Sequence, residues 1–228
     1  MSAGARLLAT PFGRLAVLAL PAEDDAAALE RLAEALAPEE RAHARGLAPA
    51  RRHTWVGGRA ALRAALADLG LAVGAILATP RGAPALPAGI LGSIAHKRTI
   101  AVALAAPAAA AAPEDYTLGV DVELDRPPRV DISARVLTEC ERRRVDALAP
   151  AARPSAVLRA FTAKEAVYKA LDPWLGRFVA FTEVEVHADD ARARFAPRAG
   201  EPSFDIELHE EPLAGHLLVT ARVQRRAG

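Results

Sequence analysis

Several features that would narrow the class of this protein are missing from its 228 residues. Its single cysteine, Cys140, excludes an internal disulfide and a cysteine-rich zinc site. Positive and negative side chains nearly cancel, with 29 Lys and Arg against 28 Asp and Glu. A general nucleic-acid binder would normally show a basic excess, so this class is disfavoured. Any site for an anion must therefore be local.

Long apolar runs are also missing. Pro11, Gly13 and Arg14 interrupt the N-terminal stretch, which argues against a signal peptide. No segment approaches the roughly 18 apolar residues of a membrane-spanning helix. The sequence has neither the phosphate-binding loop of ordinary nucleoside triphosphatases nor a dinucleotide-binding fingerprint. We predict a soluble, cytoplasmic protein without a membrane or nucleic-acid partner.

Apolar periodicity predicts an α+β fold in two halves, each a small, mostly antiparallel sheet packed with helices. An alanine run bounded by Pro107 and Pro113 is interpreted as the linker, which separates a half at 1–112 from a half at 113–228. The helices expected are 24–36, 38–46, 49–69, 138–148 and 154–171. The strands expected are 14–20, 75–78, 93–94, 100–105, 116–123, 178–187, 203–209 and 217–223.

Three acidic residues are placed so that they can converge. Asp121 and Glu123 alternate with valines on a predicted strand, so both point to the same face. Glu165 falls at the edge of a helical apolar stripe, where a carboxylate is costly unless a cation holds it. Three such carboxylates suit a hard divalent cation such as Mg²⁺. Each part also has a simpler interpretation, as a solvent-facing strand end or as a surface ion pair between Glu165 and Lys169.

Two lysines beside Glu165 indicate that a phosphate group comes to the metal. Lys164 and Lys169 lie roughly 140° apart around the helix, so they flank the carboxylate. Three carboxylates with two lysines are typical of a phosphoryl-transfer site.

The first half has the parts of an anion site. Arg52, Arg59 and Arg63 are spaced so that they share one helix face within about 40°. Such like charges repel one another unless an anion or carboxylates answer them, and a solvated basic face is the alternative interpretation. A turn at 81–84 and a small-residue loop at 92–97 could cradle phosphate through backbone N–H groups.

Jointly, these motifs resemble the paired signatures of the Sfp-type 4′-phosphopantetheinyl transferases. Gly-x-Asp-x-Glu is matched at 119–123, and Trp/Phe-x-x-Lys-Glu-Ala-x-x-Lys at 161–169. Upstream elements between 51 and 96 resemble most the branch of enterobactin synthetase component D. The resemblance covers about residues 50–185 in the family's order and spacing.

The sequence departs from the family at two positions. Ala95 stands where many relatives have Ser or Thr, which puts one hydroxyl contact to the cofactor in doubt. Phe161 replaces the commoner tryptophan but keeps an aromatic anchor.

The resemblance implies an activity and partners. The activity is Mg²⁺-dependent transfer of 4′-phosphopantetheine from coenzyme A to a serine of an apo carrier protein, with Mn²⁺ as an alternative ion. The partners would be carriers of fatty-acid, polyketide or nonribosomal-peptide synthases. The implied fold is a monomeric pseudo-dimer of two similar α/β halves.

The resemblance also assigns residues. Asp121, Glu123 and Glu165 would bind the metal, and Glu165 and Lys169 would be catalytic, with Glu165 as base. The residues expected to hold the phosphates of coenzyme A are Arg51, Arg52, Arg59, Arg81, Ser93, His96, Lys164 and Lys169.

Two other functions stay open. A Mg²⁺-dependent phosphohydrolase would use the same carboxylates without a carrier, and a non-catalytic coenzyme A-binding module would need only the basic elements. Carrier docking is expected on the arginines between the two metal motifs, and the alternative is a solvated helix face balanced by acidic neighbours. These arginines are Arg126, Arg129, Arg135, Arg142, Arg143 and Arg144, and the neighbours are Glu139, Glu141 and Asp146.

Overall fold

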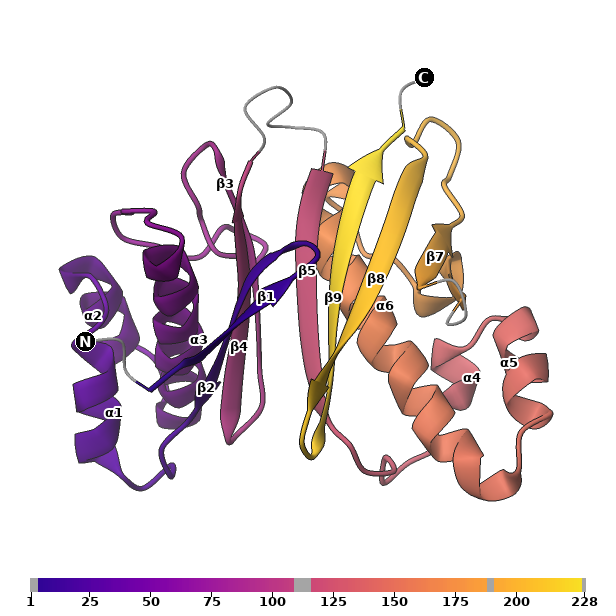
Figure 1. Ribbon diagram of the computed structural model, residues 1–228, viewed down its shortest axis with the longest axis horizontal. Coiled ribbons are helices and arrows are strands. Elements are labelled where there is room, and N and C mark those ends of the chain that lie inside the picture. Colours follow the sequence, from indigo (N-terminus) through magenta and orange to yellow (C-terminus); the bar gives the residue numbers. More distant parts are fainter. Residues whose placement is uncertain (1–3, 109–115, 188–190, 227–228) are drawn as a thin grey trace. The chain divides into compact units, whose positions relative to one another are not determined.

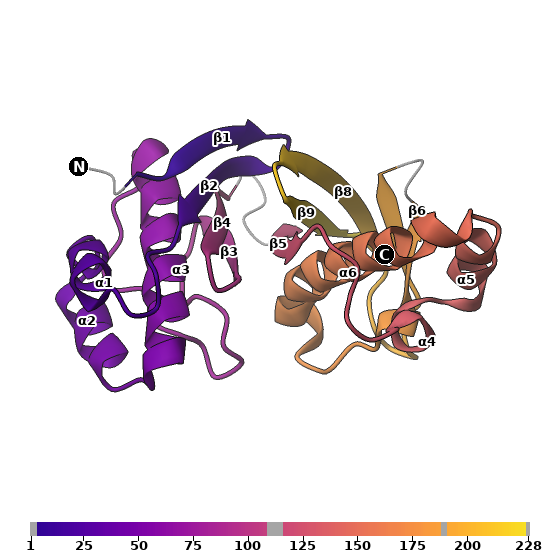
Figure 2. The ribbon, with the colours of Figure 1, turned by 90° about the horizontal axis from the view of Figure 1, so that it is seen from below.

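The computed structural model describes residues 4–108, 116–187 and 191–226, which form two compact units, Met1–Glu114 and Asp115–Gly228. Each unit is an antiparallel sheet with its helices packed on one face (Figures 1 and 2). The predicted α+β class is confirmed. The segment interpreted as a linker lies outside the described residues, apart from Pro107 and Ala108.

The first unit has a four-stranded sheet of order β1-β2-β4-β3. Strand β4 is buried along almost its whole length, which explains its continuous run of apolar residues. The long helix α3 begins with proline at its first position, where no N–H partner is needed. The strands are β1 (Arg6–Thr10), β2 (Gly13–Ala19), β3 (Ile90–His96) and β4 (Ile100–Pro107). The helices are α1 (Ala26–Ala33), α2 (Pro38–Arg45) and α3 (Pro49–Asp68).

Two adjacent glycines let α3 lie close to its neighbours. A Cβ atom on Gly57 would come within 2.2 Å of Leu20, and one on Gly58 within 2.8 Å of Ile94. Glycine in the interior of a helix costs about 1 kcal/mol relative to alanine, so this pair is explained by close packing.

The second unit has a five-stranded sheet of order β5-β9-β8-β7-β6. Helix α6 packs on β5 and β9 and ends at Gly176, whose φ of +58° is the left-handed conformation that glycine adopts readily. The strands are β5 (Tyr116–Leu124), β6 (Val184–His187), β7 (Arg192–Phe195), β8 (Phe204–Leu213) and β9 (His216–Arg225). The helices are α4 (Ser133–Val136), α5 (Glu139–Asp146), η1 (Pro150–Ala152), α6 (Arg153–Leu175) and η2 (Phe181–Glu183).

Some predicted elements were wrong. Within the strand expected at 178–187, residues 181–183 form the short helix η2, and only 184–187 is a strand. The strand expected at 75–78 is reduced to a single bridge between Ala78 and Pro84. Strands β1 and β7 were missed because they are short and partly exposed, so their apolar alternation is weak.

Gly119 of β5 sets the distance to α6. A Cβ atom there would lie 1.9 Å from the carbonyl oxygen of Ala166, which is far inside van der Waals contact. The Thr117 hydroxyl donates to the carbonyl of Ala170 at 2.5 Å, and the Trp174 indole donates to that hydroxyl at 2.8 Å. The glycine of the Gly-x-Asp-x-Glu motif is therefore required by packing.

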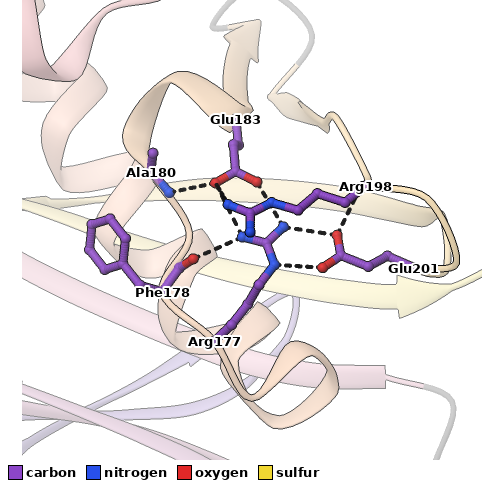
Figure 3. A network of polar contacts seen from close by, with 6 residues as sticks. All are labelled: Arg177, Phe178, Ala180, Glu183, Arg198 and Glu201. Carbon is purple, nitrogen blue, oxygen red and sulfur yellow. Dashed lines mark hydrogen bonds and ion pairs between the residues drawn. The ribbon is translucent and has the colours of Figure 1, made fainter.

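An arginine joins the segment after α6 to the loop between β7 and β8 (Figure 3). Arg177 donates all five of its N–H groups, to Glu183, Glu201 and the carbonyl of Phe178. Arg198 adds a contact to Glu183 at 3.2 Å. The hydrogen bonds from Arg177 lower the pKa of the Glu201 carboxyl to about 2 and also lower that of Glu183.

We expect Gly119→Ala to lower the free energy of unfolding by about 3 kcal/mol, the upper end of ordinary overpacking costs, because a backbone carbonyl blocks the new methyl group. Urea-induced unfolding measures this. Gly74→Ala is the control, because no atom lies within 4 Å of its Cβ position, and it should change stability by less than about 0.5 kcal/mol. Equal stability of the two variants would contradict the packing argument.

The ion pair between Arg177 and Glu201 should stabilise the protein only at a pH where Glu201 is ionised. Because the pKa of Glu201 falls from an ordinary 4.5 to about 2 on folding, its contribution is full above pH 4.5 and is lost as the pH falls towards 2. We expect Glu201→Gln to lower the urea midpoint at pH 7, with a difference that shrinks steadily below pH 4.5. Glu207→Gln, which removes a more exposed pair with Arg222, should have a smaller effect. A pH-independent loss for Glu201→Gln would exclude the carboxylate as its cause.

Candidate active site

The contact between β5 and α6 brings Lys169 onto Asp121. The ammonium donates to Asp121 Oδ1 at 2.7 Å and to the carbonyl of Val120 at 2.9 Å. Asp121 is only 7% exposed, so its carboxylate is largely shielded from water, while Lys169 is half-buried. The sequence prediction assigned Lys169 to a phosphate and missed this pair, although Gly119 is the signal that α6 comes close here.

The second oxygen of Asp121 is buried and has no hydrogen-bond partner among the described residues. A buried carboxylate oxygen without a donor is costly, and a cation bound there would satisfy it. The donor chemistry at this position therefore fits a hard divalent metal. In the ranges that the structure covers, however, no three His, Cys, Asp or Glu side chains are gathered as a metal centre. A metal role for the three carboxylates stays a prediction.

The other two predicted metal ligands lie on the same pair of elements. Glu165 directly precedes Ala166, which touches Gly119, and it lies one helical turn before Lys169. Glu123 is two residues beyond Asp121 and shares its strand face. Both glutamates are half-buried. The structure thus places the acidic residues and Lys169 along one stretch of the β5–α6 contact.

Lys164 occupies a different environment from the one predicted. Its side chain has no exposed surface, and its ammonium donates to Glu141 Oε2 at 2.5 Å and to the carbonyls of Val136 and Phe181 at 2.7 and 3.0 Å. Burial lowers the pKa of Lys164, and the Glu141 carboxylate opposes that shift. Acceptors of this chain use all three N–H donors, which favours a structural role for Lys164, and its contact with a phosphate stays a prediction.

The arginines of α3 also have partners within their own unit. Arg59 is buried, donates to the carbonyls of Ile76 and Leu77 at 2.7 and 2.9 Å, and stacks over Trp55 at 4.8 Å. Its burial lowers its pKa to about 10. Arg63 donates to the buried carboxylate of Glu40 at 2.7 Å.

Carbonyl oxygens accept from Nε and Nη2 of Arg59, which favours a structural role for it, and its phosphate contact stays a prediction. Arg52 forms an ion pair with Glu30, so a carboxylate also answers that charge. The like charges of Arg52, Arg59 and Arg63 are thus balanced by carboxylate and carbonyl oxygens of this chain. Sequence reasoning missed Glu40, because a single glutamate in an acidic helix carries no separate signal.

Arg51 and His96 are the predicted phosphate-binding residues that the structure brings together. Arg51 Nη1 lies 3.5 Å from His96 Nε2, so the exposed start of α3 meets the end of β3. Ser93 is buried on β3, and Arg81 is exposed in the turn that the Ala78–Pro84 bridge closes.

The arginine-rich segment before α6 is only partly a free basic surface. Arg143 pairs with Glu139, and Arg144 donates to the carbonyl of Val186 at 3.0 Å. Glu141, which was considered a balancing surface charge, is buried. The other arginines of the segment, Arg126, Arg129, Arg135 and Arg142, are exposed.

Two family models match the chain. Residues 117–221 match the 4′-phosphopantetheinyl transferase superfamily, and residues 39–106 match the 4′-phosphopantetheinyl transferase N-terminal domain. The chain is also 38% identical over 165 residues to the 4′-phosphopantetheinyl transferase Svp of Streptomyces mobaraensis, a match that covers 72% of this chain and 65% of that protein, just under two thirds of its length.

Solved structures resemble one half of the chain. Holo-[acyl-carrier-protein] synthase of Thermotoga maritima is 23% identical, with a TM-score of 0.39 over 49% of this chain and 64% of that one. An ACPS–CoA complex from Chronobacterium ammoniagenes is 17% identical, with a TM-score of 0.39 over 50% of this chain and 100% of that one. Among the described helices, none combines the length and apolarity of a membrane span. From the two family matches, the chain belongs to the 4′-phosphopantetheinyl transferase superfamily.

Proposed function

We propose that this protein transfers 4′-phosphopantetheine from coenzyme A to a serine of an apo carrier protein in a Mg²⁺-dependent reaction. Membership of the superfamily supports the reaction class. The observation that carries the proposal is the buried second oxygen of Asp121, which has no hydrogen-bond partner within the described ranges and lies beside Lys169 where α6 crosses β5.

In this proposal, Asp121, Glu123 and Glu165 hold the metal. When bound, it supplies positive charge that stabilises the leaving group of the coenzyme A pyrophosphate. Glu165 accepts the proton of the carrier serine, and the serine oxygen bonds to the phosphorus on the pantetheine side. The bond from that phosphorus to the bridging oxygen breaks, and 3′,5′-adenosine bisphosphate leaves. Lys169 supplies N–H donors at the same place.

The first unit would recognise the other phosphates of coenzyme A. Arg51 and His96 are the strongest candidates, because they meet and Arg51 is exposed. Arg81 and Ser93 would contribute from the neighbouring turn and strand. Arg59 and Arg63 would act indirectly, since they fix the segment 74–77 that leads to the turn with Arg81.

The partner would be an apo carrier protein of a fatty-acid, polyketide or nonribosomal-peptide synthase. An acidic carrier would be recognised by the exposed arginines of the segment between the two motifs. The engagement of Arg143 and Arg144 by acceptors of this chain makes Arg142 the better candidate on α5.

Intact-mass measurement tests the function directly. Several purified apo carriers are incubated with the protein, coenzyme A and Mg²⁺, and at least one should gain the mass of one phosphopantetheine group. Release of phosphopantetheine without a carrier would instead indicate a phosphohydrolase. Binding of coenzyme A without either product would indicate a non-catalytic module.

We expect Asp121→Asn to reduce the carrier modification rate about 100-fold or more, because the metal loses a charged ligand worth several kcal/mol. The rate is measured at saturating coenzyme A with circular dichroism as the check of folding. Asp205→Asn is the matched control, since it removes an exposed carboxylate paired with Arg226 in the same unit. If folded Asp121→Asn modifies the carrier as fast as Asp205→Asn does, the assignment of Asp121 as a metal ligand is wrong.

Recognition of the 3′-phosphate should depend on Arg51 more than on its neighbour Arg52, which already pairs with Glu30. We expect Arg51→Ala to raise KM for coenzyme A about tenfold or more, because a charge-assisted contact to phosphate is lost. KM for 3′-dephospho-coenzyme A should barely change. The prediction fails if Arg51→Ala raises both KM values equally, or if Arg52→Ala has the larger effect.

A further inference from the structure

Helix α6 is held on two sides. On one side, Ala166 touches Gly119 and Lys169 reaches Asp121, both on β5. On the other side, the Lys164 ammonium contacts three separate elements, since its acceptors are Glu141 of α5, Val136 of α4 and Phe181 of η2. The helix is therefore fixed by polar contacts from two directions.

Both oxygens of the Glu141 carboxylate also accept hydrogen bonds. Its Oε2 accepts the N–H of Thr138 at 2.7 Å together with the Lys164 ammonium, and its Oε1 accepts the N–H of Val186 at 2.7 Å. Glu141 is 4% exposed. Every polar group in this buried pair has a partner, so the arrangement is specific in direction as well as favourable.

These contacts bear on the residue next to Lys164. Successive helical residues are 100° apart, so the rotation that aims Lys164 at α4 and α5 also determines where Glu165 points. Glu165 and Lys169 differ by only 40° and share the side that faces β5. Apolar contacts alone would tolerate small rotations, whereas three directed hydrogen bonds from one ammonium do not.

We propose that Lys164 and Glu141 are positioning residues, which lock the rotation of α6 so that Glu165 faces Asp121 and Glu123. This inference rests on the proposed function. Neither residue touches substrate or metal: the pair acts through Glu165, as outer partners of metal ligands do in other metal sites.

The test uses Lys164→Met, which keeps most of the side-chain volume and removes the ammonium. Mn²⁺ is titrated into the full chain at saturating coenzyme A, with coenzyme A alone as the blank, and free Mn²⁺ is followed by its paramagnetic resonance signal. We expect Mn²⁺ affinity to fall about 10–100-fold, the range for loss of an outer partner of a metal ligand. Should Lys164→Met fail to fold, Glu141→Gln, which retains an acceptor, carries the same expectation.

Two further variants separate positioning from general stability. The double variant Lys164→Met/Glu141→Gln should recover thermal stability relative to Lys164→Met, because no carboxylate is left buried without its cation, but Mn²⁺ affinity should stay low. Arg177→Met breaks another ion network of this unit and should lower stability while leaving Mn²⁺ affinity unchanged.

The inference is wrong, while the proposed function still stands, if folded Lys164→Met binds Mn²⁺ with unaltered affinity. The same holds if Arg177→Met loses Mn²⁺ affinity in proportion to its loss of stability. If the wild-type protein binds no Mn²⁺ and modifies no carrier, the proposed function is wrong and the inference falls with it.

Discussion

The close approach of α6 to β5 at Gly119 is the constraint on which the candidate site depends. With no side chain between them, the Ala166 carbonyl and the Gly119 backbone are in contact. This brings the Lys169 ammonium within reach of Asp121. The other oxygen of that carboxylate is buried and has no donor in the part of the chain that the structure describes. A larger residue at 119 would move the helix away and expose both charges to water, where their interaction is weak.

The two units share one arrangement of buried polar groups, called the polar device below. In each, a buried glutamate at the third position of a short helix accepts the N–H of the helix cap, a cation from the long helix and one further backbone N–H. The glutamate and the cation are Glu40 and Arg63 in the first unit and Glu141 and Lys164 in the second, and both pairs are 23 residues apart. In both units, the device joins the long helix to a short helix and to a later segment.

Sequence reasoning predicted the α+β class and the motif residues on β5 and α6, because strand alternation and helical periodicity are local properties. It did not predict which lysine faces β5, since Lys164 and Lys169 lie on opposite sides of Glu165 around the helix and the packing of α4 and α5 was not known. The protein acceptors of the α3 arginines were missed for the same reason. The common face of these arginines was predicted correctly, but the acceptors that meet Arg59 and Arg63 come from residues 74–77 and Glu40, which are distant in sequence.

The repeated device also explains why the proposed chemistry belongs to the second unit. Five residues after the device's cation, each long helix forms an ion pair with its sheet, but the signs are reversed. Asp68 of α3 meets Arg14 of β2 at 2.6 Å, whereas Lys169 of α6 meets Asp121 of β5 at 2.7 Å. Directly after the cation, the first unit has Ala64 and the second has Glu165. The first unit thus has a basic strand paired with Asp68 and an alanine at the position of Glu165, whereas the second unit has an acidic strand and a glutamate at that position. Of these two arrangements, the second suits a divalent cation.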